Sequence, residues 1–207
     1  MLFAKDFRRM AKESLAPYWW PSIGCMLLYM LVSGAATGTV IGAIVLAGPL
    51  WYGYNAYWLD RARGWRPTIG TLFEGFSHCF GTSIATYLLQ GLFTFLWALL
   101  LFVPGIIKSY SYAMCPYILR DCPNMDALEV IDTSRAMMDG NKWRLFCLHL
   151  SFIGWLLLCA VTFGIAGFYV IPYMQTSTAA FYDAVKAEYA AENPEFTYIL
   201  NNETMDH

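Results

Sequence analysis

Three long segments of the chain contain no Asp, Glu, Lys or Arg residue: residues 14–59, 75–107 and 145–182. About 20 predominantly apolar residues are enough for an α-helix to cross a bilayer. The stretch from Leu88 to Leu119 has no polar face, which is typical of a membrane span or a deep core helix. The composition agrees, because 58% of the residues are hydrophobic and only 14% are charged, against roughly 25% charged residues in soluble domains. We therefore expect an integral membrane protein.

Each charge-free segment is long enough for two membrane helices and contains a plausible turn. The turns are expected at residues 33–38, at Pro104-Gly105 and at residues 162–167, where small residues or Pro interrupt the apolar run. This predicts an all-α, polytopic fold with about six transmembrane helices in three hairpins. The fourth helix, from Pro104 to Leu119, is short for a full crossing, so a tilted or partly buried helix stays open.

A short amphipathic helix is predicted before each hairpin, at residues 2–16, 68–77 and 125–139. Apolar residues recur there at helical spacing, and such helices commonly lie in the headgroup layer of a membrane. The pattern divides the single membrane domain, residues 1–186, into possible repeats at 3–59, 67–120 and 124–186. The alternative is coincidence, because Gly, Pro and Tyr are common at helix starts near a membrane surface. Residues 187–207 are acidic and are expected to form a flexible cytoplasmic tail.

The distribution of Lys and Arg predicts the orientation, since basic residues favour the cytoplasmic side. With six spans, both termini and nearly all basic residues face the cytoplasm. Lys108 alone falls on the outer side, where its long side chain can reach the headgroups. The expected location is therefore the cell membrane, as a multi-pass protein.

Several functional classes receive no support from the sequence. The formal net charge of −2 provides no basic field for nucleic acid. We find no zinc-type Cys/His spacing, no serine-hydrolase or zinc-protease motif and no phosphate-binding loop. We therefore expect no enzyme activity, no catalytic residues, no cofactor and no metal.

Five polar residues at membrane depth are the candidate site residues: Lys108, His149, Gln90, Gln175 and Asn55. An ionisable residue inside a membrane is a functional hypothesis by default. Lys108 is either an anchor at the membrane surface or a cation offered to an anionic ligand. His149 either relays protons or binds a ligand, or it is a neutral, hydrogen-bonded packing residue. Interhelical hydrogen bonding also accounts for the three amides.

Four stretches of the sequence resemble a known family. They are GPLWYGYNAYWLDRARG from Gly48, PTIGTLFEGF from Pro67, FVPGIIKSYSYAMCPYIL from Phe102 and SRAMMDGNKWRLFCLHLSFIGWLLL from Ser134. The chain resembles the bacterial integral membrane proteins known as domain of unknown function 975. The resemblance implies a helical membrane protein, chiefly of Gram-positive bacteria. It implies no activity, cofactor or catalytic residue.

The expected function is therefore that of a non-catalytic integral membrane protein of the bacterial cell envelope. A partner-binding, regulatory, resistance or immunity role needs only packed helices and cytoplasmic amphipathic elements. The expected partners are the lipid bilayer and either another membrane protein or further copies of the chain. The alternative is a small-solute transporter or a transporter subunit, because membrane repeats are common in transporters.

Overall fold

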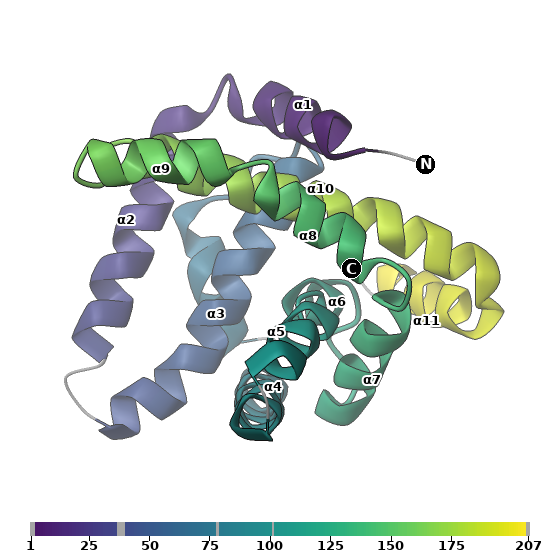
Figure 1. Ribbon diagram of the computed structural model, residues 1–207. Helices are drawn as coiled ribbons and strands as arrows, with labels where there is room; N and C mark the ends of the chain where they lie inside the picture. The colour runs from purple at the N-terminus through teal and green to yellow at the C-terminus, as the bar shows by residue number, and fades with distance from the viewer. Residues whose placement is uncertain (1–2, 37–39, 78, 101, 206–207) are drawn as a thin grey trace.

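The computed structural model describes residues 3–36, 40–77, 79–100 and 102–205, and every regular element within these ranges is a helix (Figure 1). The all-α class is thereby confirmed. In chain order the helices are α1 (Ala4–Leu15), α2 (Trp19–Ala36), α3 (Val40–Ala62), η1 (a 3-10 helix, Ile69–Phe76), α4 (Phe80–Leu100), α5 (Phe102–Ser111), α6 (Cys115–Asp121), α7 (Ala127–Met137), α8 (Lys142–Leu150), α9 (Ile153–Val161), α10 (Gly167–Glu192) and α11 (Pro194–Met205).

Helices occupy all three segments predicted to be amphipathic: α1, η1 and α7. Acidic side chains in the first turn fix two of the starts. The backbone N–H of Phe3 donates to Asp6 at 3.0 Å, and that of Asp126 donates to Glu129 at 3.2 Å. These carboxylates accept amide protons that have no partner within the helix.

The buried faces of these helices are narrower than the sequence predicts. Phe7, Ala11 and Leu15 bury one stripe of α1. In contrast, Phe73 of η1 and Leu128 of α7 are 43% and 57% exposed. The buried face of α7 consists of Val130, Ile131, Ser134 and Met137. The placement of these helices at a membrane surface stays a prediction.

The helices pair into three hairpins, α2 with α3, α4 with α5, and α8–α9 with α10. The third predicted turn is confirmed, since Phe163 and Gly164 adopt positive φ angles of 49° and 89° between α9 and α10. The first predicted turn needs a correction over residues 33–36, which are still helical at the end of α2, whereas residues 37 and 38 lie outside the described residues. The second prediction needs a correction, because Pro104-Gly105 lies inside α5. A Cβ at Gly105 would come within 2.7 Å of the Ala98 Cα atom, so the small residue serves the contact between α4 and α5.

Two helical segments are long and apolar enough to cross a membrane, Phe80–Leu99 and Lys142–Val161. A third is added if α1 and α2, which meet at 98°, form one broken span. The fourth predicted span is divided into α5, with 10 residues, and α6, with 7. At 1.5 Å per residue α5 covers only about 15 Å, half of the ~30 Å hydrocarbon core. The six-span arrangement therefore stays a prediction.

The C-terminal segment differs from the flexible tail that the sequence suggests. Helix α10 continues to Glu192, and α11 follows from Pro194. The ring of Phe196 is buried and packs edge-on against Tyr189, with the two ring centroids 5.2 Å apart. Aromatic burial thus keeps this acidic segment helical and attached to α10.

The packing of the amphipathic helices follows a regular order. Helix α1 lies along α10, η1 lies along α3, and α7 lies against α4 and α6. Each therefore covers a helix of the preceding predicted unit, with the third unit preceding the first. A closed order of this kind is what a threefold repeat would produce, although the repeat itself stays a prediction. The hairpins α2–α3 and α9–α10 extend in different directions from their common base (Figure 1).

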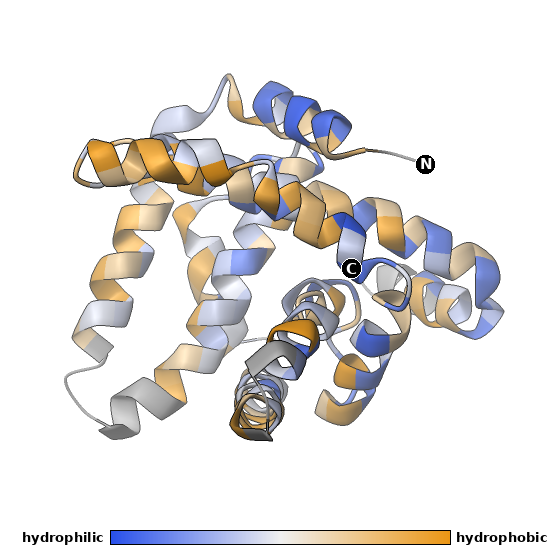
Figure 2. Cartoon of the chain, viewed as in Figure 1, coloured by the Kyte–Doolittle hydropathy of each residue, from blue (hydrophilic) through white to orange (hydrophobic). Residues whose placement is uncertain are grey.

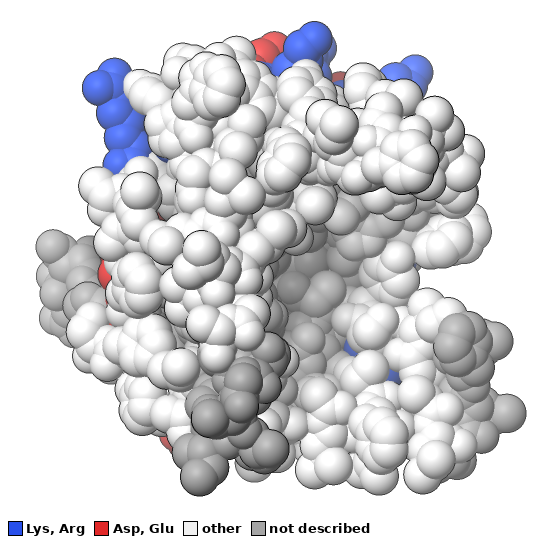
Figure 3. All heavy atoms as spheres, turned by 90° about the vertical axis from the view of Figure 1, so that its left-hand side faces the viewer, with Lys and Arg blue, Asp and Glu red and all other residues white. Residues whose placement is uncertain are grey.

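Apolar and charged residues are segregated over the molecule. Hydrophobic residues concentrate on α9 and much of α2, whereas α1 and the end of α10 are largely hydrophilic (Figure 2). The face shown in Figure 3 is almost free of charged side chains and is hollowed in its middle. Large apolar side chains that are exposed include Leu31, Leu99, Leu157, Val161 and Phe163.

Candidate functional site

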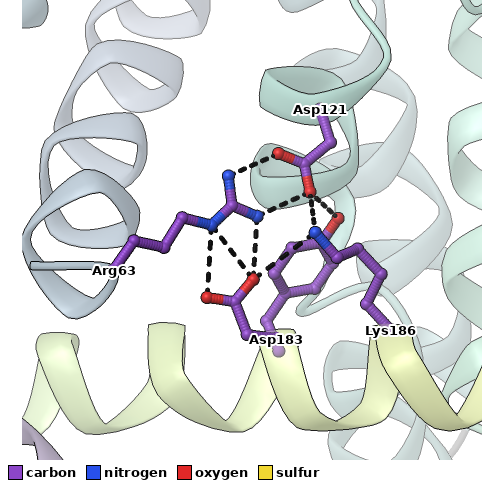
Figure 4. A network of polar contacts seen from close by, with 5 residues as sticks. Arg63, Asp121, Asp183 and Lys186 are labelled. Atoms are coloured by element: carbon purple, nitrogen blue, oxygen red, sulfur yellow. Dashed lines mark hydrogen bonds and ion pairs between the residues drawn. The ribbon is translucent and has the colours of Figure 1, made fainter. Parts of the chain in front are cut away.

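Four charged side chains and a tyrosine meet at the base of the hairpins, and we call them the ionic cluster. Its members are Arg63, Asp121, Tyr182, Asp183 and Lys186 (Figure 4). Arg63 directly follows α3, Asp121 ends α6, and the other three lie on α10. The ionic cluster therefore joins the end of α3 and the end of α6 to the C-terminal half of α10.

Arg63 binds two carboxylates at once. Its Nη1 and Nη2 atoms donate to the two oxygens of Asp121 at 2.8 and 2.7 Å. Its Nε atom donates to Asp183 Oδ1 at 3.1 Å, and Nη2 donates to the same oxygen at 2.8 Å. A planar guanidinium suits such paired contacts, which are stronger than single neutral hydrogen bonds.

Asp121 is the centre of the cluster. Besides Arg63 it accepts hydrogen bonds on Oδ2 from Lys186 Nζ at 2.8 Å and from the Tyr182 hydroxyl at 2.9 Å. Its side chain is only 9% exposed. Burial by itself raises the pKa of the Asp121 carboxyl, but Arg63 and Lys186 outweigh it, and the pKa lies below its ordinary value. Asp121 is thus held as a carboxylate between two cations.

Two further arginines form ion pairs between helices. Arg120 of α6 donates to Asp60 of α3 at 2.9 Å and also to Glu74 of η1. Arg144 of α8 donates to both oxygens of Glu188 on α10, at 2.6 and 3.1 Å, and this contact lowers the pKa of the Glu188 carboxyl. All three sets of contacts connect helices that are distant in the sequence. These contacts hold the helices together at the base of the hairpins.

Lys108 lies in an open pocket that the sequence does not predict. The pocket has a volume of about 430 Å³, and its polar lining consists of Lys108, Ser111, Asp132, Arg135, Asp139 and Lys142. The sequence places Lys108 alone on the outer side of a membrane and Arg135 and Lys142 on the inner side. The structure instead brings these three cations together. The reason is that α5 ends after 10 residues, at Ser111, whose carbonyl accepts a hydrogen bond from Ser134 of α7.

His149 of α8 takes part in contacts with two other helices. One ring nitrogen is 3.3 Å from the Tyr110 hydroxyl on α5, and the other is 3.3 Å from the Thr178 hydroxyl on α10. With both nitrogens engaged by neutral hydroxyls, the geometry matches a hydrogen-bonded packing residue. A proton relay or a ligand-binding role for His149 stays a prediction.

The three candidate amides lie on different helices. Asn55 donates to the Trp51 carbonyl within α3 at 2.7 Å, and Gln175 is half-buried on α10. The Oε1 atom of Gln90 on α4 is buried and has no hydrogen-bond partner within the described ranges, and the same holds for Thr86 Oγ1 one turn earlier. Within the part of the chain that the structure describes, no hydrogen bond or ion pair joins any two of the five predicted site residues.

The ionic cluster is the feature that sequence analysis missed. A signal for it exists, because an apolar, aromatic run ends in oppositely charged residues at each of three places. These are Asp60 to Arg63, Arg120-Asp121, and Asp183 to Lys186. The distribution of Lys and Arg predicts an orientation, but it contains no information on whether these three places lie close together.

Metal-binding side chains show no comparable gathering. Among the described residues, no three or more His, Cys, Asp or Glu side chains converge as a potential metal site.

Comparison with known proteins finds a family match over part of the chain and no activity. Neither the curated proteins nor the solved structures contain a match to this chain. The segment from the end of α4 to α10, in contrast, matches a family model. Residues 99–189 match the model of the family described as "Protein of unknown function (DUF975)", and over this part of the chain the resemblance drawn from the sequence is confirmed.

Proposed function

We propose that the chain is a non-catalytic integral membrane protein of the bacterial cell envelope that acts by binding a partner in the membrane. The observation that supports the proposal most is the uncharged, hollowed face of Figure 3. Soluble monomers rarely expose apolar patches larger than a few hundred Å². Side chains such as Leu99, Leu157 and Phe163, which are 72%, 65% and 98% exposed, require lipid or protein around them.

The topology that we propose has each hairpin entering the membrane from the cytoplasmic side and returning to it. Six membrane helices and two cytoplasmic termini follow, with the return of the second hairpin divided between α5 and α6. The charged helix α1 and the ionic cluster then lie on the cytoplasmic side, where basic residues are favoured.

A partner-binding role fits how the charged groups are used. In the ionic cluster the cations are paired with carboxylates that hold the hairpins together. The face shown in Figure 3, in contrast, is left uncovered by the described residues. Another membrane protein or a second copy of the chain would bury it.

A photo-crosslinking experiment tests the proposal. A photoreactive residue replaces Leu31 on α2 or Leu157 on α9, and the control replaces Tyr198 on α11, which is similarly exposed at 68% but lies in the hydrophilic part. In native membranes, we expect both apolar positions to form a discrete protein adduct that the control does not form. Adducts with lipid only at both positions would contradict a protein partner.

A transporter role is the second candidate, and one observation favours it. The buried Gln90 and Thr86 oxygens lie on the same side of α4, and neither has a partner within the described residues. Unsatisfied polar groups at membrane depth are costly, and a polar solute would satisfy them. Solute uptake by proteoliposomes that Gln90→Leu abolishes would support this alternative.

A further inference from the structure

The pocket around Lys108 contains an unequal set of charges. Arg135 donates to Asp132 at 2.8 Å, and Lys142 Nζ lies 3.8 Å from Asp139. Lys108 has no carboxylate within ion-pair distance among the described residues. Its ammonium lies instead 4.7 Å from the centroid of the Trp97 ring. The pocket therefore has one cation more than it has carboxylates, and an anion would balance it.

The walls of the pocket are held together by contacts of their own. The Ser134 hydroxyl of α7 donates to the Ser111 carbonyl of α5 at 2.9 Å, and both residues are buried. This bond ties α7, which carries Arg135, to α5, which carries Lys108. The cations are thus brought together by the fold, and a bound anion need not gather them.

The surroundings of Lys108 select an amphipathic anion. On the same helix, Ile106 and Ile107 are 42% and 48% exposed. On α4, Leu96 and Leu99 are exposed near Trp97. At the far side of the pocket Trp143, which follows Lys142, is 70% exposed, and Trp favours the boundary between membrane and water. An ammonium beside an apolar helix surface fits a phosphate that carries acyl chains.

We propose that this pocket binds the phosphate group of an anionic phospholipid, with Lys108 as the principal contact and Arg135 and Lys142 as supporting charges. The acyl chains lie along the exposed apolar side of α4 and α5. This rests on the membrane placement in the proposed function. Basic pockets between membrane helices are a recurring form of lipid recognition.

The test uses the full-length chain purified in neutral detergent. Binding of phosphatidylglycerol and of phosphatidylcholine is measured by native mass spectrometry. We expect phosphatidylglycerol to bind more tightly, and Lys108→Gln to weaken it by about fivefold, the effect of one basic residue at a membrane surface. Lys108→Arg should keep the preference. The matched control is Lys12→Gln on α1, an exposed lysine outside the pocket, which should leave binding unchanged.

A variant with the opposite expected sign guards against a trivial loss of folding. The Asp139 side chain is 88% exposed, so Asp139→Asn leaves the packing intact and removes a negative charge from the pocket. It should strengthen phosphatidylglycerol binding. If Lys108→Gln does not fold, Asp139→Asn tests the proposal by itself. Unchanged phosphatidylglycerol binding in Asp139→Asn then overturns the proposal.

Further outcomes separate the possible errors. Equal binding of the two lipids, or an equal loss in Lys12→Gln and Lys108→Gln, overturns the proposed site. If inorganic phosphate displaces the lipid completely and itself requires Lys108, the ligand is free phosphate and the lipid assignment is wrong. If alkaline extraction removes the chain from native membranes, the proposed function fails first, independently of the lipid result.

Discussion

Gly53 of α3 lies directly against the backbone of Leu72 in η1, so that a Cβ atom at Gly53 would overlap the Leu72 carbonyl. A second glycine makes the reciprocal contact, since a Cβ at Gly75 would come within 2.5 Å of the Pro49 carbonyl oxygen. These glycines lie in two of the stretches that carry the family resemblance. The helices approach each other here at backbone distance, which only glycine allows.

The contact predicts that Gly53→Ala destabilises the protein. The added methyl group has no room, and overpacking of this kind typically costs about 1–3 kcal/mol. Thermal unfolding in detergent, followed by circular dichroism, should show a lower Tm. The control is Gly91→Ala on α4, where no atom lies within 4 Å of the new Cβ. Its Tm should stay unchanged or rise, because Ala favours a helix by about 1 kcal/mol over Gly.

Removing the central carboxylate of the ionic cluster should be costly. Asp121→Asn leaves Arg63 and Lys186 without a shared counter-ion in a largely buried position. Breaking one partner of such a pair costs on the order of 3 kcal/mol. Unfolding by heat or denaturant measures the loss. In Asp139→Asn the altered side chain is 88% exposed, and its stability should stay within about 0.5 kcal/mol of the original. Equal effects of the two variants would contradict a structural role for the cluster.

The same residue predicts how stability depends on pH. Because the pKa of Asp121 is lowered in the folded protein, its contribution is fully present above the ordinary carboxyl pKa of about 3.9. The contribution is lost as the pH falls through the lower, folded pKa. We expect a nearly constant Tm between about pH 7 and pH 5 and a decline below about pH 4. In Asp121→Asn the decline should be smaller, and an identical decline would assign the acid sensitivity to other groups.

Cysteine labelling distinguishes the pocket from the orientation that the sequence suggests for Lys108. In the structure, Ser109 is an exposed neighbour of Lys108, and Asp139 lines the pocket itself. Ser109→Cys and Asp139→Cys should therefore react with a membrane-impermeant thiol reagent from the same side of the membrane. The baseline is the unaltered chain, whose own cysteines are buried or half-buried. Labelling of the two cysteines from opposite sides would separate Lys108 from Arg135 and contradict the shared pocket.

Local patterns in the sequence predict the elements of this fold well. Amphipathic spacing indicates α1, η1 and α7, because each buries one stripe of side chains. The Phe163-Gly164 turn follows from small residues between two apolar runs. Hydropathy alone does not show that a run is divided into shorter helices. The break between α8 and α9 at Ser151-Phe152 is an example. Phe152 is buried in the core, and because its side chain is apolar, the hydropathy of the run does not reveal the break.

The candidate sites were less predictable because they depend on contacts between distant parts of the chain. Arg63 and Asp183 are separated by 120 positions, and Lys108 and Arg135 line one pocket although they lie on different helices. A single sequence contains no distance information of this kind. The five predicted site residues lie on five different helices.

The ionic cluster also sets an order of events during synthesis of the chain. Arg63 and Asp121 belong to the first two hairpins, whereas Asp183, Lys186 and the Tyr182 hydroxyl all arrive with α10. A ribosome delivers α10 last of the hairpin helices, and α1, the first helix made, then gains the long contact along it. The two earlier hairpins are therefore held together at their base by only part of the final network until the third hairpin has been translated. A nascent chain that stops before Gly167 lacks both Lys186, which pairs with Asp121, and the helix against which α1 packs.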